Sequence, residues 1–307
     1  MPILSARARV AGLVGWPVAH SRSPRLQNFW LERHGIDGAY VPLAVPPASL
    51  PAAIRGLAAA GFAGCNVTIP HKEAAAGLCD SVTDAARRIG AVNTLVFHNG
   101  KIDGSSTDGE AFLANLRAHG VDPAAGPALV LGAGGAARAV VAALLDAGAH
   151  VSITNRTSGR AEALCRVFPA LTPLPWEARS AALAGQALLV NTTAAGMQGR
   201  PPFDLDLGAA DARLTVADLV YAPPETPLLA RAKIRGLKIV PGLGMLLHQA
   251  VPGFEAWFGV RPVVDPEVIA FVAASLAADW APGAPQGRTA EQDRGTNPGR
   301  ANYGRMT

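Results

Sequence analysis

The sequence predicts an α/β fold in two domains. Its 307 residues are enough for two domains of ordinary size. Apolar β-type runs alternate with helical segments along most of the chain, which is typical of α/β domains with a mostly parallel sheet. A glycine-rich turn at residues 132–137 separates a strand from a helix, and this pattern marks the second domain.

The first domain is expected at residues 1–108, as an α/β unit with a mostly parallel sheet. The Ser23-Pro24 pair predicts a helix start with Ser23 as the N-cap. The His98-Asn99-Gly100 turn predicts a hairpin. In order, the expected elements are strands at 9–15, 39–45, 63–69, 91–97 and 101–105, with helices at 23–34, at 50–60 and just after 72.

The second domain is expected at residues 109–244, after a helix that begins near Asp108. Gly132 permits a tight turn, Gly134 lets a pyrophosphate approach the backbone, and Ala137 lets helix and strand pack closely. The helix N-terminus offers free N–H groups and the positive end of its dipole to phosphates. With later strands at 187–191, 214–219 and 238–240, this predicts a Rossmann-type doubly wound sheet. The dinucleotide contacts are expected at Gly132, Ala133, Gly134, Gly135 and Ala136.

The end of the next strand, at residues 155–160, indicates which dinucleotide binds. An NAD-binding unit usually carries Asp or Glu about 20 residues after the turn, but this segment holds no acid. The guanidinium groups of Arg156 and Arg160 suit a 2′-phosphate. The expected cofactor is therefore NADP, held here by Asn155, Arg156, Thr157 and Arg160. The alternative is a glycine turn of another α/β fold with two solvated arginines.

The last part of the chain divides into two expected segments. Residues 245–281 contain two closing helices, at 245–257 and 266–278, and we expect one or both to pack back on the first domain. Residues 282–307 are rich in Gly, Pro, Gln, Asn and Arg, with few large apolar residues. This composition predicts a disordered tail.

The composition limits the possible binding partners and the expected cellular compartment. Three cysteines without a C-x-x-C pair indicate a reducing, cytoplasmic setting. No window has the roughly 18 uninterrupted apolar residues of a membrane span. The net charge of +4 comes from scattered arginines, which gives little support to a nucleic-acid partner. With no metal-ligand spacing in the sequence, the expected partners are small molecules, and the chain is expected to be a monomer or homodimer.

Several strings in the sequence, taken together, resemble the shikimate dehydrogenase family. They are His20 to Pro24, Asn66 to Lys72, Gly90 to Thr94, Thr107-Asp108, Gly132 to Ala139, Asn155 to Thr157, Asn191 to Thr193 with Gly196-Met197, Asp218 to Tyr221, and Gly242 to Met245 with Gln249. The resemblance covers about residues 9–280. It implies the reversible NADPH-dependent reduction of 3-dehydroshikimate to shikimate, a step of aromatic amino-acid biosynthesis.

The resemblance also implies roles for individual side chains. Ser21 and Ser23 would hold the substrate carboxylate with help from Thr68, because hydroxyl groups donate hydrogen bonds without adding a fixed charge. The ring hydroxyls would be held by Asn93, Asp108 and Gln249, with Asn66 and Tyr221 lining the same cleft. Leu219 and Gly242 would join the cofactor site. The alternatives are a plain helix cap for Ser23 and a turn residue for Asn93.

Lys72 is the expected proton-transfer group at the substrate oxygen, and Asp108 would orient it. Without the resemblance, an exposed lysine at a helix start beside Glu73 is the favoured interpretation. Two positions depart from the family pattern: Gln27 stands where His is frequent, and Ser106 where Asn is common. A quinate- or NAD-preferring relative and a ligand sensor without turnover remain as alternatives. Arg156 argues against NAD, and Lys72 with Asp108 against the sensor.

Overall fold

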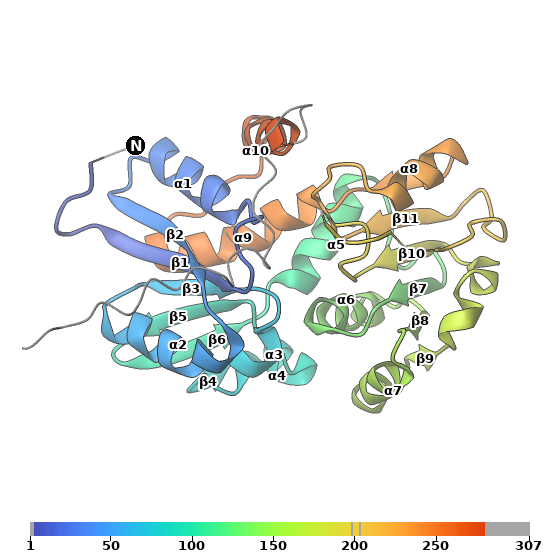
Figure 1. Ribbon diagram of the computed structural model, residues 1–307, viewed down its shortest axis with the longest axis horizontal. Coiled ribbons are helices and arrows are strands. Elements are labelled where there is room, and N and C mark those ends of the chain that lie inside the picture. Colours follow the sequence, from blue (N-terminus) through green and yellow to red (C-terminus); the bar gives the residue numbers. More distant parts are fainter. Residues whose placement is uncertain (1–2, 198, 203, 280–307) are drawn as a thin grey trace, which may run out of the picture.

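The computed structural model describes residues 3–197, 199–202 and 204–279, and it consists of two α/β halves side by side (Figure 1). The two-sheet α/β class predicted from the sequence is confirmed. The predicted disordered tail at 282–307 lies outside the described residues.

The first sheet has six strands in the order β2-β1-β3-β5-β6-β4. β1 pairs in parallel with β2 and β3, β4 pairs in parallel with β6, and β5 runs antiparallel to β3 and β6. The β5–β6 turn has positive φ at Asn99 (49°) and Gly100 (74°), the geometry for which Asn-Gly is favoured. The strand bounds are β1 Arg9–Gly15, β2 Gly38–Ala44, β3 Gly64–Val67, β4 Ser81–Val82, β5 Thr94–His98 and β6 Lys101–Ser105.

Helices cover both faces of this sheet, and the alternation of side chains along β1 divides the core between them. Leu13 belongs to a core shared with α1, α9 and α10. Val14, on the opposite face, belongs to a core shared with α2, α3 and α4. The bounds are α1 Ser23–Arg33, η1 Pro47–Ser49, α2 Leu50–Ala59, α3 Lys72–Ala76, α4 Asp84–Ile89, α9 Leu243–Phe258 and α10 Pro266–Asp279.

The second sheet is parallel throughout, in the order β12-β11-β10-β7-β8-β9. Chain order reverses at β7, which lies between β10 and β8. In a doubly wound sheet the crevice outside the carboxyl ends of the strands at this point is where ligands bind. The bounds are β7 Ala128–Leu131, β8 Val151–Thr154, β9 Thr172–Pro173, β10 Leu188–Asn191, β11 Thr215–Asp218 and β12 Lys238–Val240.

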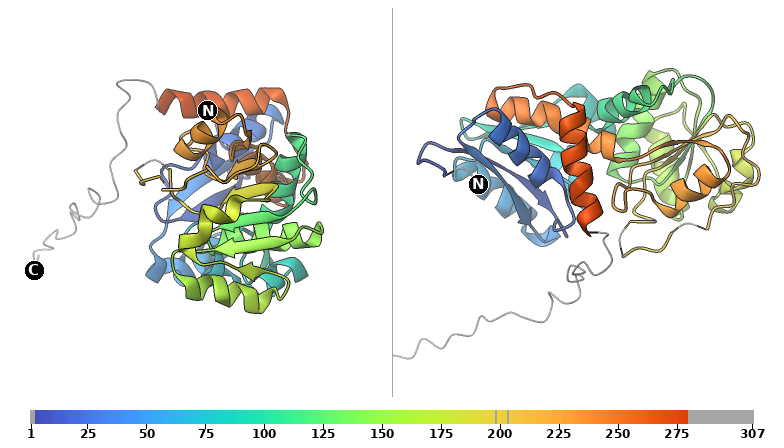
Figure 2. Two further views of the ribbon diagram at one scale, coloured as in Figure 1. Left: turned by 90° about the vertical axis from the view of Figure 1, so that its right-hand side faces the viewer. Right: turned by 90° about the horizontal axis from the view of Figure 1, so that it is seen from above.

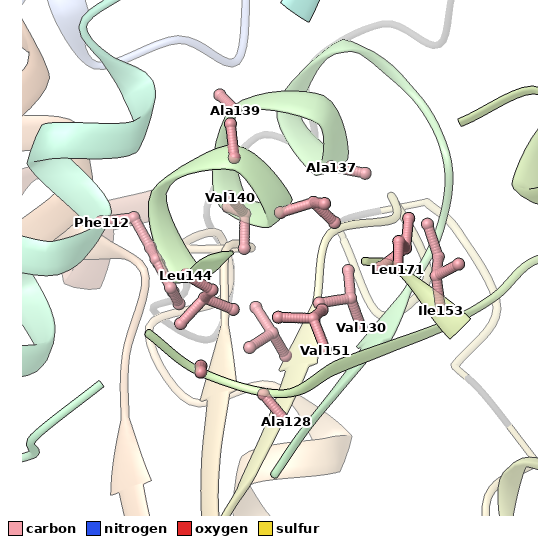
Figure 3. Packing of buried hydrophobic residues seen from close by; sticks show 14 of the residues in the cluster. Phe112, Ala128, Val130, Ala137, Ala139, Val140, Leu144, Val151, Ile153 and Leu171 are labelled. Atoms are coloured by element: carbon pink, nitrogen blue, oxygen red, sulfur yellow. The ribbon is translucent and has the colours of Figure 1, made fainter. Parts of the chain in front are cut away.

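Two cores enclose the second sheet. Val140 and Leu144 of α6 lie over Val130 and Val151 of the sheet, in a core shared with α5 and α7 (Figure 3). The opposite core is shared with η3 and α8. The bounds are α5 Asp108–Ala118, α6 Gly135–Asp146, α7 Ser158–Val167, η2 Trp176–Arg179, η3 Ala181–Leu183 and α8 Pro227–Ile234.

Two helices join the halves: α5 leads from the first sheet to the second, and α9 leads back (Figures 1 and 2). They pack closely, because a Cβ atom on Gly244 would lie 2.0 Å from Oδ1 of Asn115. The Asn115 amide donates to the Pro241 carbonyl at 2.9 Å. These contacts fix α9 against α5, and with it the polar side chain of Gln249.

Three details differ from the sequence prediction. The predicted N-cap role of Ser23 is wrong: α1 begins at Ser23, Arg22 takes the N-cap position, and no side chain caps the helix. The two-residue strands β4 and β9 were not predicted, because two residues are too few to show an alternating pattern. Helix α4 was also missed, although Thr83 caps it by accepting from the Ala86 amide at 3.3 Å.

Candidate active site

A cleft of about 450 Å³ lies between the two halves, at the carboxyl ends of β1, β3, β7, β10 and β11. Nine of its lining residues are those predicted from the sequence to act on substrate: Ser21, Ser23, Asn66, Thr68, Lys72, Asn93, Asp108, Tyr221 and Gln249. They come from both halves and from α9, so the fold brings together residues far apart in the sequence.

Lys72 and Asp108 form an ion pair in this cleft, between the lysine Nζ and the aspartate Oδ2. Their side chains are 15% and 5% exposed, respectively. Lys72 begins α3, and its carbonyl accepts from the Val92 amide at 3.0 Å. Asp108 begins α5, whose positive dipole end stabilises its carboxylate charge. The pair therefore presents an oriented ammonium group, shielded from bulk water, at the cleft surface.

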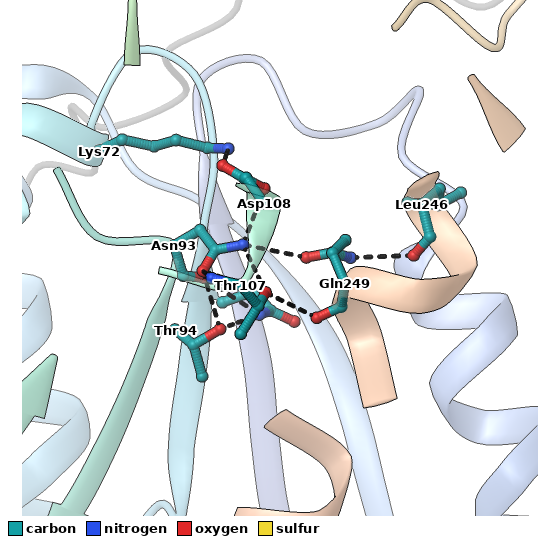
Figure 4. A network of polar contacts seen from close by, with 8 residues as sticks. Lys72, Asn93, Thr94, Thr107, Asp108, Leu246 and Gln249 are labelled. Atoms are coloured by element: carbon teal, nitrogen blue, oxygen red, sulfur yellow. Dashed lines mark hydrogen bonds and ion pairs between the residues drawn. The ribbon is translucent and has the colours of Figure 1, made fainter. Parts of the chain in front are cut away.

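Asn93 is the centre of a buried network beside this pair (Figure 4). Its Nδ2 lies 2.9 Å from Oδ1 of Asp108 and 3.3 Å from Oε1 of Gln249. Its Oδ1 accepts from the Thr107 amide at 2.9 Å. Thr107 Oγ1 donates to the Gln249 carbonyl at 2.8 Å, which ties α9 to the start of α5. The side chains assigned to ring hydroxyls are thus held in place by hydrogen bonds among themselves.

Asn66 lies deeper and is fully engaged with protein groups. Its Oδ1 accepts from the Tyr40 hydroxyl at 2.7 Å, and its Nδ2 donates to the Asn93 carbonyl and to Thr94 Oγ1, both at 3.1 Å. An amide with both its hydrogens donated has little donor capacity left for a ligand. Asn66 therefore lines the cleft and supports Asn93 from behind.

Another part of the cleft lining presents hydroxyl groups. Ser21 Oγ accepts from the Ser23 amide at 3.2 Å, and Tyr221 of the second half lines the cleft beside Ser21. Burial raises the pKa of the Tyr221 hydroxyl, so the phenol stays protonated and able to donate. His20 also lines the cleft, and burial followed by the nearby Arg22 charge lowers its pKa. These hydroxyl donors form a suitable site for a carboxylate.

The dinucleotide turn faces the same cleft. Of the predicted cofactor residues, six line it: Gly134, Gly135, Ala136, Arg160, Leu219 and Gly242. Gly132 has φ of 107°, and a Cβ atom there would meet Thr192 Oγ1 at 2.6 Å, so only glycine fits. Apart from the residues adjacent to it in the chain, no described atom lies within 4 Å of a Cβ placed on Gly134. The space over Gly134, at the start of α6, can thus accept a pyrophosphate against free N–H groups.

The remaining predicted cofactor residues lie outside this lining: Gly132, Ala133, Asn155, Arg156 and Thr157. Asn155 Nδ2 donates to the Thr157 carbonyl at 2.9 Å, which shapes the turn after β8. Arg156 and Arg160 are exposed, and within the described part of the chain neither guanidinium forms a hydrogen bond or ion pair. Two unengaged guanidinium groups beyond the pyrophosphate site fit a 2′-phosphate.

A buried carboxylate supports the loops on this side. Asp218, at the end of β11, accepts from Asn191 Nδ2 at 2.8 Å, Thr226 Oγ1 at 2.7 Å and the Val220 amide at 3.0 Å. Burial raises its pKa to about 6, although all three hydrogen bonds lower it. These contacts fix the segment that carries Leu219 and Tyr221.

Several residues of the site were part of the family motifs in the sequence but received no role. Thr193 and Met197 line the cleft after β10, and their place beyond the carboxyl end of a buried strand beside β7 is a signal for such a role. Thr107 was predicted only as part of a motif, although its hydroxyl bridges Asn93 and Gln249. Its contacts span 14 and 142 positions of sequence, and no local pattern predicts them.

Within the ranges that the structure describes, no group of three or more His, Cys, Asp or Glu side chains could hold a metal ion. In the same ranges no helix has both the length and the apolar character needed to span a membrane.

Comparison with known proteins identifies the family. Family models match at residues 13–95 (shikimate dehydrogenase substrate binding domain), 118–197 (shikimate/quinate 5-dehydrogenase) and 242–266 (shikimate 5′-dehydrogenase C-terminal domain). The NADP(+)-dependent shikimate dehydrogenase of Acidiphilium cryptum is 66% identical over 274 residues, covering 89% of this chain and 99% of the relative. That of Rhodospirillum rubrum is 58% identical, covering 86% and 96%.

The chain belongs to the shikimate dehydrogenase family. A solved relative, the Thermus thermophilus enzyme in complex with NADP(H) and shikimate, is 40% identical with a TM-score of 0.79, covering 87% of this chain and 99% of its own. The likeness therefore extends over both halves of the fold and the cleft between them.

Proposed function

We propose that this chain catalyses the reversible NADPH-dependent reduction of 3-dehydroshikimate to shikimate, a step of aromatic amino-acid biosynthesis. One observation carries the proposal: the Lys72–Asp108 pair lies in a single cleft with the dinucleotide turn. Curated relatives that carry the name NADP(+)-dependent shikimate dehydrogenase support it across both halves of the chain.

The substrate occupies the first half of the cleft. Ser21 and Ser23 bind its carboxylate, with Thr68 nearby and Tyr221 reaching Ser21 from the other half. Asn93, Asp108 and Gln249 bind the ring hydroxyls, for which amide and carboxylate groups offer matching donors and acceptors. A hydroxyl bound at Asn93 takes the place of the 3.3 Å contact between its Nδ2 and Gln249, which is longer than the 2.9 Å contacts with Thr107 and Asp108. We assign substrate binding to residues 1–108, cofactor binding to 109–244 and closure of the first half to 245–281.

The cofactor is NADP, and when bound it supplies the hydride. The N–H groups at the start of α6 face its pyrophosphate, and Arg156 with Arg160 bind the 2′-phosphate. Asn155, Thr157, Leu219 and Gly242 complete this side. The observations in favour are the space over Gly134 and the two unengaged guanidinium groups.

Lys72 handles the proton. As the substrate carbonyl carbon is reduced, negative charge grows on its oxygen, and the Lys72 ammonium group donates a proton or a charged hydrogen bond to it. In the reverse direction the amine takes the proton back. Asp108 holds the long lysine side chain in one orientation, so that the group is positioned before the substrate arrives.

A turnover assay with 3-dehydroshikimate and NADPH tests the proposal, with NADH and quinate as competing cofactor and substrate. NADPH oxidation with shikimate as product is the expected result. Binding of both ligands without turnover would show that the protein is a ligand sensor and not an enzyme. Preference for quinate or NADH would show that the proposed substrate or cofactor is wrong. The cytoplasmic location and the monomeric or homodimeric state predicted from the sequence remain predictions, the second testable by sedimentation.

A further inference from the structure

Helix α6, whose N-terminus forms the dinucleotide turn, also contacts the first half of the molecule along one face. Gly135, Arg138 and Asp146 lie on that face at helical spacing. Gly135 meets the lysine of the candidate active site: a Cβ atom placed on it would be 3.1 Å from Cβ of Lys72 and 3.5 Å from its Cδ. The aliphatic stem of Lys72 therefore rests on the backbone of the opposite half.

Arg138, one turn further along α6, holds two points of the first half near Lys72. Its Nη1 donates to the Ile89 carbonyl at 3.2 Å, at the C-terminal end of α4. Its Nη2 lies 3.6 Å from Oε2 of Glu73, the residue next to Lys72. The Arg138 side chain is 19% exposed and that of Glu73 is 52% exposed, so solvent weakens the Glu73 contact more than the contact with the Ile89 carbonyl.

The third contact on this face is peripheral. Arg88 of α4 binds both carboxylate oxygens of Asp146, at 2.7 and 2.9 Å, and its side chain is 46% exposed. This pair also joins the two halves, but it lies about two turns of α6 beyond Arg138 and does not contact Lys72. It offers a matched comparison for Arg138.

Lys72 needs support from outside its own helix. α3 has only five residues, too few to be stable by itself. Asp108 holds the tip of the side chain, but the backbone of Lys72 depends on the Val92 amide, three residues after Ile89. Arg138 fixes the segments on both sides of this backbone contact, through Ile89 and through Glu73.

We propose that Arg138 is a positioning residue of the reaction: it keeps Lys72 seated on Gly135, at a fixed distance from the dinucleotide turn. This inference rests on the function proposed above. A displacement of about 1 Å in a reacting group can cost on the order of 100-fold in rate. The cofactor helix thereby sets the place of the proton donor as well as that of the cofactor.

Arg138→Gln, which removes the charge and shortens the side chain, is the first test. We expect kcat for 3-dehydroshikimate to fall about 10-fold to 100-fold, with the Kd for NADPH and the melting temperature nearly unchanged. Arg138→Lys, which keeps one donor for the Ile89 carbonyl, should recover part of the loss. Arg88→Gln, the matched control on the same interface, should keep kcat within about twofold.

The deciding measurement repeats Arg138→Gln in a Lys72→Ala background, with single-turnover hydride transfer as the readout. If Arg138 acts through Lys72, adding Arg138→Gln to Lys72→Ala changes the rate less than about twofold, because the effects of substituting residues that act as a unit are not additive. An equal fold-loss in both backgrounds, or a normal kcat in Arg138→Gln alone, overturns the inference. Inactive wild-type protein would instead overturn the proposed function.

Discussion

Asn93 in the first half of the cleft and Arg156 in the second are both proposed ligand contacts, and they stand in opposite surroundings. Asn93 is 2% exposed and joined by hydrogen bonds to Asp108, Thr107 and Gln249. Arg156 is exposed and, among the described residues, without a polar partner. The substrate half is organised in advance by its own network, whereas the phosphate-binding edge of the cofactor half consists of independent charges.

This difference has an energetic reason. A ring that carries several hydroxyl groups must find several donors and acceptors at once, so side chains already fixed in place spare the entropy of ordering them on binding. A 2′-phosphate carries its own charge, and a flexible guanidinium can reach it from solvent. Substitutions in the first half should therefore change kcat or the KM for the substrate, and substitutions at the edge of the second half should change cofactor affinity alone.

Lys72→Ala is expected to have the largest effect and tests this separation directly. We expect kcat to fall by about 10²–10⁴-fold, the usual contribution of a positioned acid or base, while the Kd for NADPH stays nearly constant. Lys72→Arg should restore little, because a guanidinium does not release its proton. The exposed Lys101→Ala is the matched control for removing a lysine. Near-normal turnover of Lys72→Ala would remove Lys72 from the mechanism.

Asp218 provides the pH-dependent test, because it is a buried carboxylate on the cofactor side. Its pKa in the folded protein is about 6, above the ordinary value of 3.8. The folded state therefore holds the proton more tightly, and the stability that this contributes is present below pH 3.8 and lost as pH rises through about 6. The difference between the two pKa values corresponds to about 3 kcal/mol.

Asp218→Asn should abolish the decrease in unfolding free energy that accompanies deprotonation of Asp218 as pH rises through about 6. The amide oxygen can still accept from Asn191 and Val220, and the amide nitrogen can donate to Thr226, whose hydroxyl reorients. The unfolding free energy of the variant, measured with urea, should rise relative to wild type between pH 4 and 7, by about 3 kcal/mol. A difference that does not change with pH would mean that Asp218 titrates normally.

Arg156→Ala tests the other side of the comparison. We expect NADPH binding to weaken by roughly 1.5–3 kcal/mol, the value of a hydrogen bond to a charged group. The affinity for NADH and the unfolding free energy without ligand should stay unchanged, since the guanidinium supports no described part of the fold. Arg166→Ala, an exposed arginine on the far end of α7, is the control. A wild type that prefers NADH would show the cofactor assignment to be wrong.

The same contrast explains how much the sequence could predict. The glycine turn, β8 and the lack of an acid near Arg156 are consecutive features, and a local pattern carries them. Most of the longer elements could be placed for the same reason. The bridge from Thr107 to Gln249 and the contact of Arg138 with Ile89 depend on tertiary packing between distant segments. The sequence places Asp218 at the end of a buried strand, but its hydrogen bonds to Asn191 and Thr226 are visible only in the folded structure.

Ser23→Ala should have the smallest effect, and the structure makes the expectation sharper than the sequence did. Because Ser23 does not cap α1, its replacement should leave the unfolding free energy within about 0.5 kcal/mol of wild type. Two serines share the substrate carboxylate, so the loss of one should weaken substrate binding by about 1–2 kcal/mol. This corresponds to a KM raised roughly 5–30-fold, with NADPH affinity unchanged.

Ser21→Ala is the partner experiment, because the Ser21 hydroxyl accepts a hydrogen bond from the protein backbone. Its hydroxyl accepts from the Ser23 amide and lies beside Tyr221 of the second half. Its loss should therefore raise KM by a similar factor and also lower the unfolding free energy by about 0.5–1.5 kcal/mol, since the Ser23 amide loses its acceptor and the partly buried Tyr221 loses a polar neighbour. Equal stability of the two variants would show that the contact between Ser21 and Tyr221 forms only when substrate is bound. In that case the carboxylate site would be assembled by its ligand, unlike the network around Asn93.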